Sequence, residues 1–67
     1  MYQPHEQRVI DEYTELGVKV DKLDKFFDSA IYDSLTSEEA VLLRKQFNYM
    51  VGYLGILADR IKLFKPT

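Results

Sequence analysis

The feature that most constrains this chain is a pair of matching heptad seams. In the first half, apolar residues recur at alternating steps of four and three, at Val9, Tyr13, Leu16, Val20, Leu23, Phe27 and Ala30. The same alternation links Ala40, Leu43, Phe47, Met50, Leu54, Leu57, Ile61 and Phe64 in the second half. Such steps keep residues on one side of an α-helix. The chain is therefore predicted to form two helices, each with one apolar side.

Local signals mark the ends of these helices. Pro4 suits the first turn of a helix, where a missing N–H costs nothing, and the next proline is Pro66. Asp and Ser residues interrupt the helical pattern after position 27, and Thr36 with Glu39 forms a capping box. We expect one domain over residues 1–67, with a helix at about 4–28, a turn at about 29–36 and a helix at about 37–64.

The two seams keep one register when the second helix folds back antiparallel on the first. The pairs that meet are Val9 with Ile61, Tyr13 with Leu57, Leu16 with Leu54, Val20 with Met50, Leu23 with Phe47 and Phe27 with Leu43. Gly17 falls opposite Tyr53, where the missing side chain would admit a ring. The expected fold class is all-α, an antiparallel two-helix hairpin.

A lone hairpin of this sequence leaves apolar surface uncovered. The second helix carries a further stripe beside its seam, formed by Leu42, Tyr49, Tyr53, Ile56 and Leu63. Monomeric proteins avoid contiguous exposed apolar patches. We therefore expect copies of the hairpin to assemble into a helical-bundle homo-oligomer, a dimer or higher, in which Gly52 and Gly55 let another helix approach. The alternative is a loose monomeric hairpin with exposed tyrosines.

Composition excludes several classes of function. The chain has no cysteine and one histidine, which excludes disulfides, thiolate metal sites and a His-only metal cage within one copy. A net charge of −2 disfavours long nucleic acid and anionic membranes as partners, and no apolar run is long enough to span a bilayer. No catalytic or cofactor-binding motif occurs. We expect a cytosolic protein that is not an enzyme and has no cofactor or metal.

One polar cluster has ligand-binding chemistry. The antiparallel register places His5, Arg8 and Glu12 near Arg60, which continues the line of Tyr49 and Tyr53. Guanidinium groups bind phosphates bidentately, and aromatic faces stack on bases. The candidate ligand-binding residues are His5, Gln7, Arg8, Tyr49, Tyr53 and Arg60.

The same cluster has a structural interpretation. Arg8 and Arg60 would pair with Glu12, Asp11 or Asp59 across a subunit interface, and His5 would cap the first helix. Carboxylates elsewhere on the helices are expected to form solvated faces.

The segment Pro4-His-Glu-Gln-Arg-Val-Ile-Asp-Glu12, followed by Leu16, Lys22-Leu23 and Phe26, carries a family resemblance. The second half agrees through Leu43, Gln46, Met50, Tyr53, Ile56-Leu57 and Arg60-Ile61. Together they resemble a group of small uncharacterised helical-hairpin proteins of tailed phages and prophages, crAss-like phages among them. Gly17-Val18 departs from that pattern, in which charged residues are usual. The resemblance implies a phage origin, and hence the cytoplasm of an infected bacterial host, with no established activity.

A second analogy, in size, fold and setting, is to phage sponge proteins that sequester the nucleotide signals of bacterial immunity. It implies an immune-evasion protein that holds a small cyclic or ADP-ribose-type nucleotide at an oligomer interface, with Arg8 and Arg60 on phosphates. The alternative is a protein-interaction module, an inhibitor or adaptor, that docks a host or phage protein through its aromatic stripe.

Overall fold

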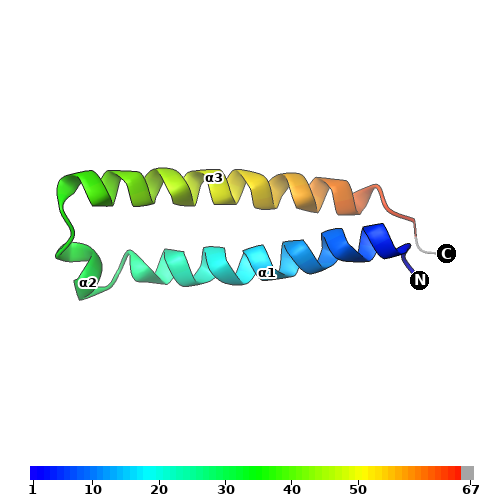
Figure 1. The fold of residues 1–67 in the computed structure, drawn as a ribbon, viewed down its shortest axis with the longest axis horizontal. Coiled ribbons are helices and arrows are strands. Elements are labelled where there is room, and N and C mark those ends of the chain that lie inside the picture. The colour runs from blue at the N-terminus through cyan, green and yellow to red at the C-terminus, as the bar shows by residue number, and fades with distance from the viewer. Residues whose placement is uncertain (66–67) are drawn as a thin grey trace.

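The computed structural model describes residues 1–65 and is an antiparallel helical hairpin. Helix α1 spans Pro4–Phe26, the short helix α2 spans Ala30–Asp33, and helix α3 spans Ser37–Lys62. The long helices lie side by side, α2 sits at the turn, and the start of α1 and the end of α3 lie at the opposite end (Figure 1). The molecule measures 50 × 16 × 14 Å. The prediction of an all-helical hairpin is confirmed; Pro66 lies outside the described residues.

Each long helix begins at a side-chain cap. The Thr36 hydroxyl accepts the Glu39 backbone N–H at 3.2 Å and donates to the Glu39 carboxylate at 3.0 Å, so the predicted cap forms. The start of α1 is capped by residues that the sequence analysis did not single out. The Gln3 backbone N–H donates to Glu6 Oε1 at 2.9 Å. His5 therefore does not act as the cap of α1; it lies exposed at the second position of the helix.

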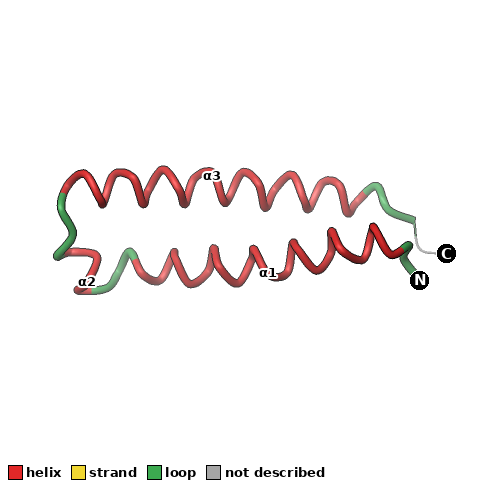
Figure 2. Tube along the Cα trace, viewed as in Figure 1, coloured by secondary structure: helices red, strands yellow, loops and turns green. Residues whose placement is uncertain are grey.

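The long helices are shorter than the predicted spans at their C-terminal ends. Helix α1 ends at Phe26, because the N–H groups of Asp28 and Ser29 bond to carbonyls three residues back. The Ser29 hydroxyl then accepts the Tyr32 N–H at 3.2 Å and starts α2 within the predicted turn. Helix α3 ends at Lys62 in the same tight manner, where the helical and loop segments meet in Figure 2. Three-residue bonds of this kind are common where helices terminate.

The core consists of residues from the two predicted seams. Val9, Leu16 and Leu57 are buried, and Leu57 is 0% exposed. The partly buried residues packed against them are Val20, Met50, Leu54, Ile61 and Phe64. Two seam residues differ. Ala30 is exposed at the start of α2. Tyr13 is 37% exposed, because a ring at the edge of a two-helix contact keeps one face in water. The heptad pattern thus located the core but did not distinguish buried seam residues from seam residues at the exposed edge of the helix contact.

Gly17 does not receive a tyrosine ring as the sequence analysis expected. A Cβ built on Gly17 lies 4.0 Å from Leu54 Cδ1 and meets no atom of Tyr53 within that distance. Leu54 is in the seam, whereas Tyr53 lies one position outside it and turns toward solvent. Gly17 therefore faces the edge of the seam in ordinary van der Waals contact, and Tyr53 remains available at the surface.

Candidate functional site

An uncovered apolar face runs along α3. We call its apolar members the α3 stripe: Leu42, Tyr49, Tyr53, Ile56 and Leu63. All five are exposed, including Tyr49 at 79% and Leu63 at 80%, although they are the large side chains that folding usually buries. The expectation that one hairpin cannot cover its own apolar surface is therefore confirmed. The stripe is the first part of the candidate site.

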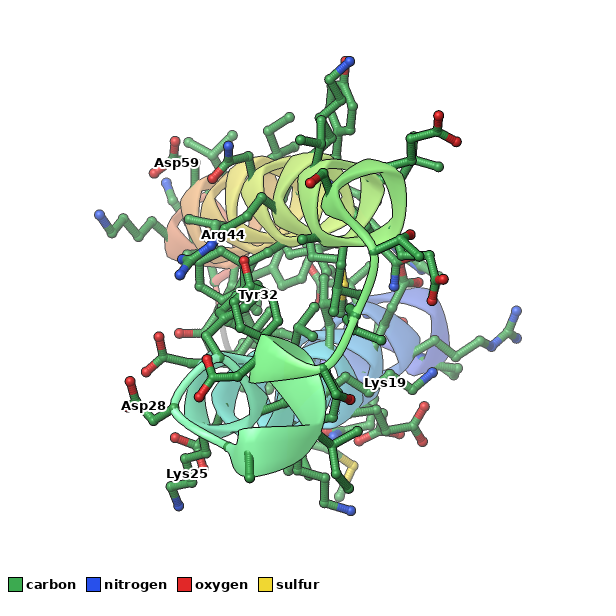
Figure 3. The ribbon with its side chains drawn as sticks, turned by 90° about the vertical axis from the view of Figure 1, so that its left-hand side faces the viewer. Lys19, Lys25, Asp28, Tyr32, Arg44 and Asp59 are labelled. Atoms are coloured by element: carbon green, nitrogen blue, oxygen red, sulfur yellow. The ribbon has the colours of Figure 1, made fainter. Side chains whose placement is uncertain are left out.

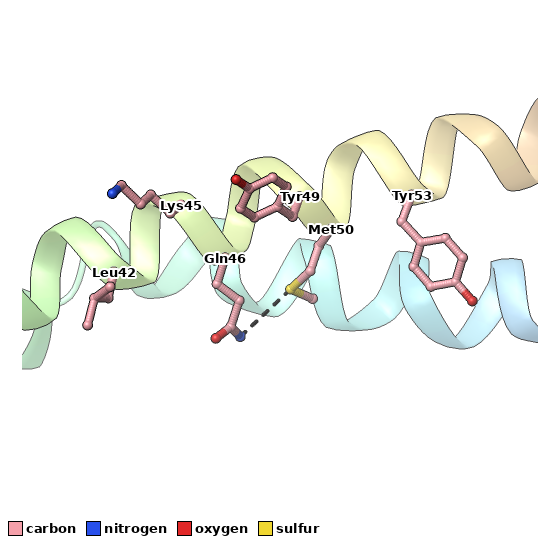
Figure 4. Close-up of a pocket in the computed structure, with 6 residues that line it drawn as sticks. All are labelled: Leu42, Lys45, Gln46, Tyr49, Met50 and Tyr53. Atoms are coloured by element: carbon pink, nitrogen blue, oxygen red, sulfur yellow. Dashed lines mark hydrogen bonds between the residues drawn. The ribbon is translucent and has the colours of Figure 1, made fainter.

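An open depression of about 580 Å³ lies over the first half of the α3 stripe. It is lined by Leu42, Lys45, Gln46, Tyr49, Met50 and Tyr53 (Figure 4). Gln46 Nε2 lies 3.9 Å from Met50 Sδ, a weak contact that leaves most of the amide's hydrogen-bonding capacity unused. All six lining residues come from α3. The depression is bounded by α3 alone and is open on the side that faces away from it, so a ligand bound to one copy would stay largely in water.

The polar candidate residues lie at the other end of the hairpin. His5, Gln7 and Arg8 are in the first two turns of α1, and Arg60 is in the last turn of α3. At a rise of about 1.5 Å per residue, Arg60 lies roughly 16 Å along α3 from Tyr49. The six candidate residues therefore do not form one cluster within a single copy. The tyrosines line the depression, and the polar residues gather near the chain ends.

The two arginines have no ionic partner within residues 1–65. Both are exposed, and the ion pairs that the structure shows in this part of the chain join Lys25 to Asp21 at 3.1 Å and Lys62 to Asp59 at 3.7 Å. Asp59, one of the acids considered for Arg60, thus pairs with Lys62 instead. Gln7 differs from the arginines, because its Nε2 donates to Asp11 Oδ1 at 3.0 Å. Arg8 and Arg60 remain available for an anion or for another copy.

A cation–aromatic cluster at the turn was not foreseen from the sequence. Arg44 Cζ lies 3.7 Å from the centroid of the Phe27 ring, and Arg44 Nε donates to the Tyr32 hydroxyl at 3.4 Å. The Phe27 ring meets Tyr32 and Phe47 edge to face at 5.1 and 5.2 Å. Figure 3, viewed from the turn, shows Arg44 beside Tyr32 and Lys19 on the opposite side. The cluster holds α2 against α3, and the sequence offered only the aromatic residues as a signal.

Two other kinds of site are absent from residues 1–65. No group of three or more His, Asp or Glu side chains is placed to hold a metal ion there. No helix in that range is long and apolar enough to cross a membrane.

The fold and the site together define a class of small helical-hairpin protein that presents an aromatic helix face ending in an exposed arginine. Residues 3–63 match the model of the Sequestin family. The chain therefore belongs to the Sequestin family, whose name refers to sequestration.

One protein with a similar sequence comes from a phage. The chain is 38% identical over 61 residues to an uncharacterised 7.5 kDa protein from the denB–rIIB intergenic region of Enterobacteria phage T4, covering 91% of this chain and 95% of the relative. The resemblance to small phage proteins is thereby confirmed. No solved structure matches the chain.

Proposed function

We propose that this protein is a phage immune-evasion protein that sequesters a small nucleotide second messenger of bacterial defence at an interface between its own copies. The observation that carries the proposal is Arg60, which has no ionic partner among residues 1–65 and lies on the face that also holds Tyr49 and Tyr53. Membership of the Sequestin family and similarity to a phage protein support sequestration in the cytoplasm of an infected bacterium. The ligand class is a cyclic or ADP-ribose-type nucleotide.

Each candidate residue has a role that its chemistry supports. Arg60 and Arg8 neutralise phosphates through charged, bidentate hydrogen bonds. Tyr49 or Tyr53 stacks on a base, a contact worth about 1–3 kcal/mol per base. His5 and the amide of Gln7 supply further hydrogen bonds near the chain ends. No bond of the ligand is broken, so the protein acts by mass action and is not an enzyme.

Calorimetry tests this function directly. The purified protein is titrated with a panel of cyclic dinucleotides, cyclic trinucleotides, ADP-ribose and cyclic ADP-ribose. One of them is expected to bind, and Arg60→Ala is expected to weaken that binding at least about tenfold, since hydrogen bonds to charged groups contribute about 1.5–3 kcal/mol. Lys22→Ala is the matched control, because Lys22 is an exposed cation on α1 away from Arg60. If no compound in the panel binds, or if Arg60→Ala binds as tightly as the wild-type protein, the proposal is wrong.

Recovery of the ligand tests the absence of catalysis. After incubation with the protein and heat denaturation, chromatography should return the bound nucleotide chemically unchanged. A new product that accumulates with time would show turnover and would contradict sequestration by mass action.

The second candidate function is docking of a host or phage protein through the α3 stripe. The exposure of Tyr49 and Leu63 favours it, because aromatic and aliphatic anchors dominate protein interfaces. Affinity purification from infected cells separates the two functions. A stoichiometric protein partner lost in Tyr49→Ala supports docking, whereas a co-purified small molecule that absorbs ultraviolet light supports sequestration.

A further inference from the structure

Helix α3 carries three parallel rows of residues on its uncovered face. Residues seven apart lie in nearly the same direction on a helix. The central row is Leu42, Tyr49, Ile56 and Leu63; the inner row, nearer α1, is Gln46, Tyr53 and Arg60; the outer row is Lys45, Gly52 and Asp59. Figure 4 shows Gln46 and Tyr53 directed toward α1 and Lys45 directed away from it. The midpoint of the central row lies between Gly52 and Tyr53, that of the inner row at Tyr53 and that of the outer row at Gly52, so the three nearly coincide.

We propose that the α3 stripe binds a second copy of this chain, with the two α3 helices antiparallel about a two-fold axis between Gly52 and Tyr53. A two-fold interface must be self-complementary, since the same surface occurs on both sides. In this arrangement the central row covers itself completely. Leu42 lies against the partner's Leu63, and Tyr49 lies against the partner's Ile56. The four apolar residues that are exposed in one copy are thereby buried in pairs.

The charged residues select this register. In the outer row, Lys45 faces the partner's Asp59, which places opposite charges together twice in each dimer. A slip by one heptad in one direction would set Asp59 against the partner's Glu38 and leave Leu63 without a partner in the central row, and a slip in the other direction would leave Leu42 without one. A parallel pair would set the outer row of one copy against the inner row of the other, so Lys45 would face the partner's Gln46 and Gly52 would face the partner's Tyr53 ring. Like charges across an interface are unfavourable, and a ring opposite Gly52 prevents close approach, so the antiparallel, centred register is the one that the sequence of α3 matches.

The glycine in the outer row permits the helices to approach. A Cβ built on Gly52 meets no atom within 4 Å in one copy, and the two-fold axis places it next to the partner's Gly52. Small residues at a helix crossing let backbones come close, as larger ones do not. Gly55 also has open space around it, but it points away from all three rows. The two glycines are therefore matched positions, one inside the interface and one outside.

The pairing also unites the two halves of the candidate site. Within one copy, Tyr49 and Arg60 are roughly 16 Å apart along α3. In the dimer, Tyr49 of each copy sits beside Ile56 of the other, about one turn from that copy's Arg60. In the inner row, Arg60 faces the partner's Gln46, whose amide oxygen accepts a hydrogen bond without neutralising the charge. Each dimer then has two sites, each with Arg8 and Arg60 from one copy and Gln46 and Tyr49 from the other.

Disulfide trapping tests the pairing without any ligand. Because the chain has no cysteine, each introduced thiol is the only one present. Leu42→Cys and Leu63→Cys proteins are mixed and oxidised, and a heterodimer is expected that neither variant forms alone. Cross-linking of Leu42→Cys with itself would show a parallel pair and overturn the proposal. Absence of any cross-link, with a single copy in sedimentation of the unmodified protein, would overturn it as well.

The glycine pair provides a second, independent measurement. Replacing Gly by Ala on an exposed helix surface is normally stabilising. Gly55→Leu is expected to leave dimer affinity unchanged, whereas Gly52→Leu is expected to weaken it at least about tenfold with the helix content of each copy retained. Equal dimer affinity in Gly52→Leu and Gly55→Leu would contradict the close approach at Gly52.

Complementation between variants tests the shared site, and this step rests on the proposed function. Arg60→Ala and Tyr49→Leu proteins are each expected to lose nucleotide binding. A mixture of the two should regain about a quarter of the wild-type number of sites, because about half of the dimers are mixed and one of the two sites in each mixed dimer is intact. If the mixture does not recover nucleotide binding while the cysteine variants still cross-link, the dimer stands, but Tyr49 and Arg60 act in a site within one copy. Failure of the wild-type protein to bind any nucleotide would reject the function alone.

Discussion

At the residue scale, the core depends on very few side chains. Leu57 is the one large side chain described as fully buried, and only Val9, Leu16 and Phe27 join it below one-tenth exposure within residues 1–65. A chain of 67 residues rarely gains more than about 3–5 kcal/mol from its own core. Single substitutions at these positions therefore have a large effect on the whole fold.

Leu57→Ala is expected to unfold most of the protein. Truncating a buried leucine costs about 2–5 kcal/mol, which is comparable to the whole stability expected for this chain. Circular dichroism with urea titration measures the loss. Ile31→Ala is the control, because Ile31 is 65% exposed in α2, and its midpoint should move little. Equal midpoints for the two variants would contradict the assignment of Leu57 to the centre of the core.

At the scale of elements, α2 and the turn are fixed by side chains from three segments. Arg44 of α3 stacks on Phe27 and reaches Tyr32 of α2, while Ser29 caps α2 locally. The surface ion pairs contribute less, since both join exposed side chains three or four residues apart on one helix. The orientation of the turn thus depends on aromatic contacts more than on charge.

Arg44→Ala is expected to lower the free energy of unfolding by about 1 kcal/mol, since cation–π contacts at exposed sites contribute about 0.5–1 kcal/mol and the side chain also covers the Phe27 ring. Chemical denaturation followed by circular dichroism measures it. Tyr32→Phe keeps the ring and removes only the hydroxyl, so its cost should be smaller. A larger loss in Tyr32→Phe would show that the 3.4 Å hydrogen bond, and not the stacking, holds α2.

At the scale of the whole molecule, the hairpin is one contact layer thick. Its shortest dimensions are 16 and 14 Å, and the contact between α1 and α3 leaves the other side of α3 open. A bundle of two hairpins would give α3 a second apolar contact on the opposite flank of its seam. Stability and assembly should therefore be coupled.

The melting temperature is expected to rise with protein concentration. For a folded state that exists as a dimer, mass action predicts an increase of roughly 3–5 °C for each tenfold increase in concentration at this chain length. Calorimetry or circular dichroism from micromolar to millimolar protein measures the shift. A melting temperature independent of concentration, with a single copy in sedimentation, would show that the hairpin is stable alone with its α3 stripe exposed.

Nearly all of the secondary structure and the core could be predicted from the sequence, because both depend on local periodicity. Alternating steps of four and three fix which side of each helix is apolar, and Thr36 with Glu39 fixes where α3 begins. Tyr13 was predicted in the seam, but its ring lies at the edge of the contact between the helices. Helix α1 ends before its apolar pattern does, because the three-residue hydrogen bonds after Phe26 and the Ser29 cap compete with further helical hydrogen bonds.

Tertiary structure decided what the pattern left open. It set the separation between the tyrosines and the arginines, the absence of a partner for Arg60 within the described residues, and the stacking of Arg44 on Phe27 across the turn. These features depend on side chains from different segments meeting in three dimensions, and heptad spacing carries no information about such contacts. The sequence determined two helices, their apolar sides and the stripe of α3 that one hairpin leaves uncovered; the folded chain determined which side chains of different segments meet.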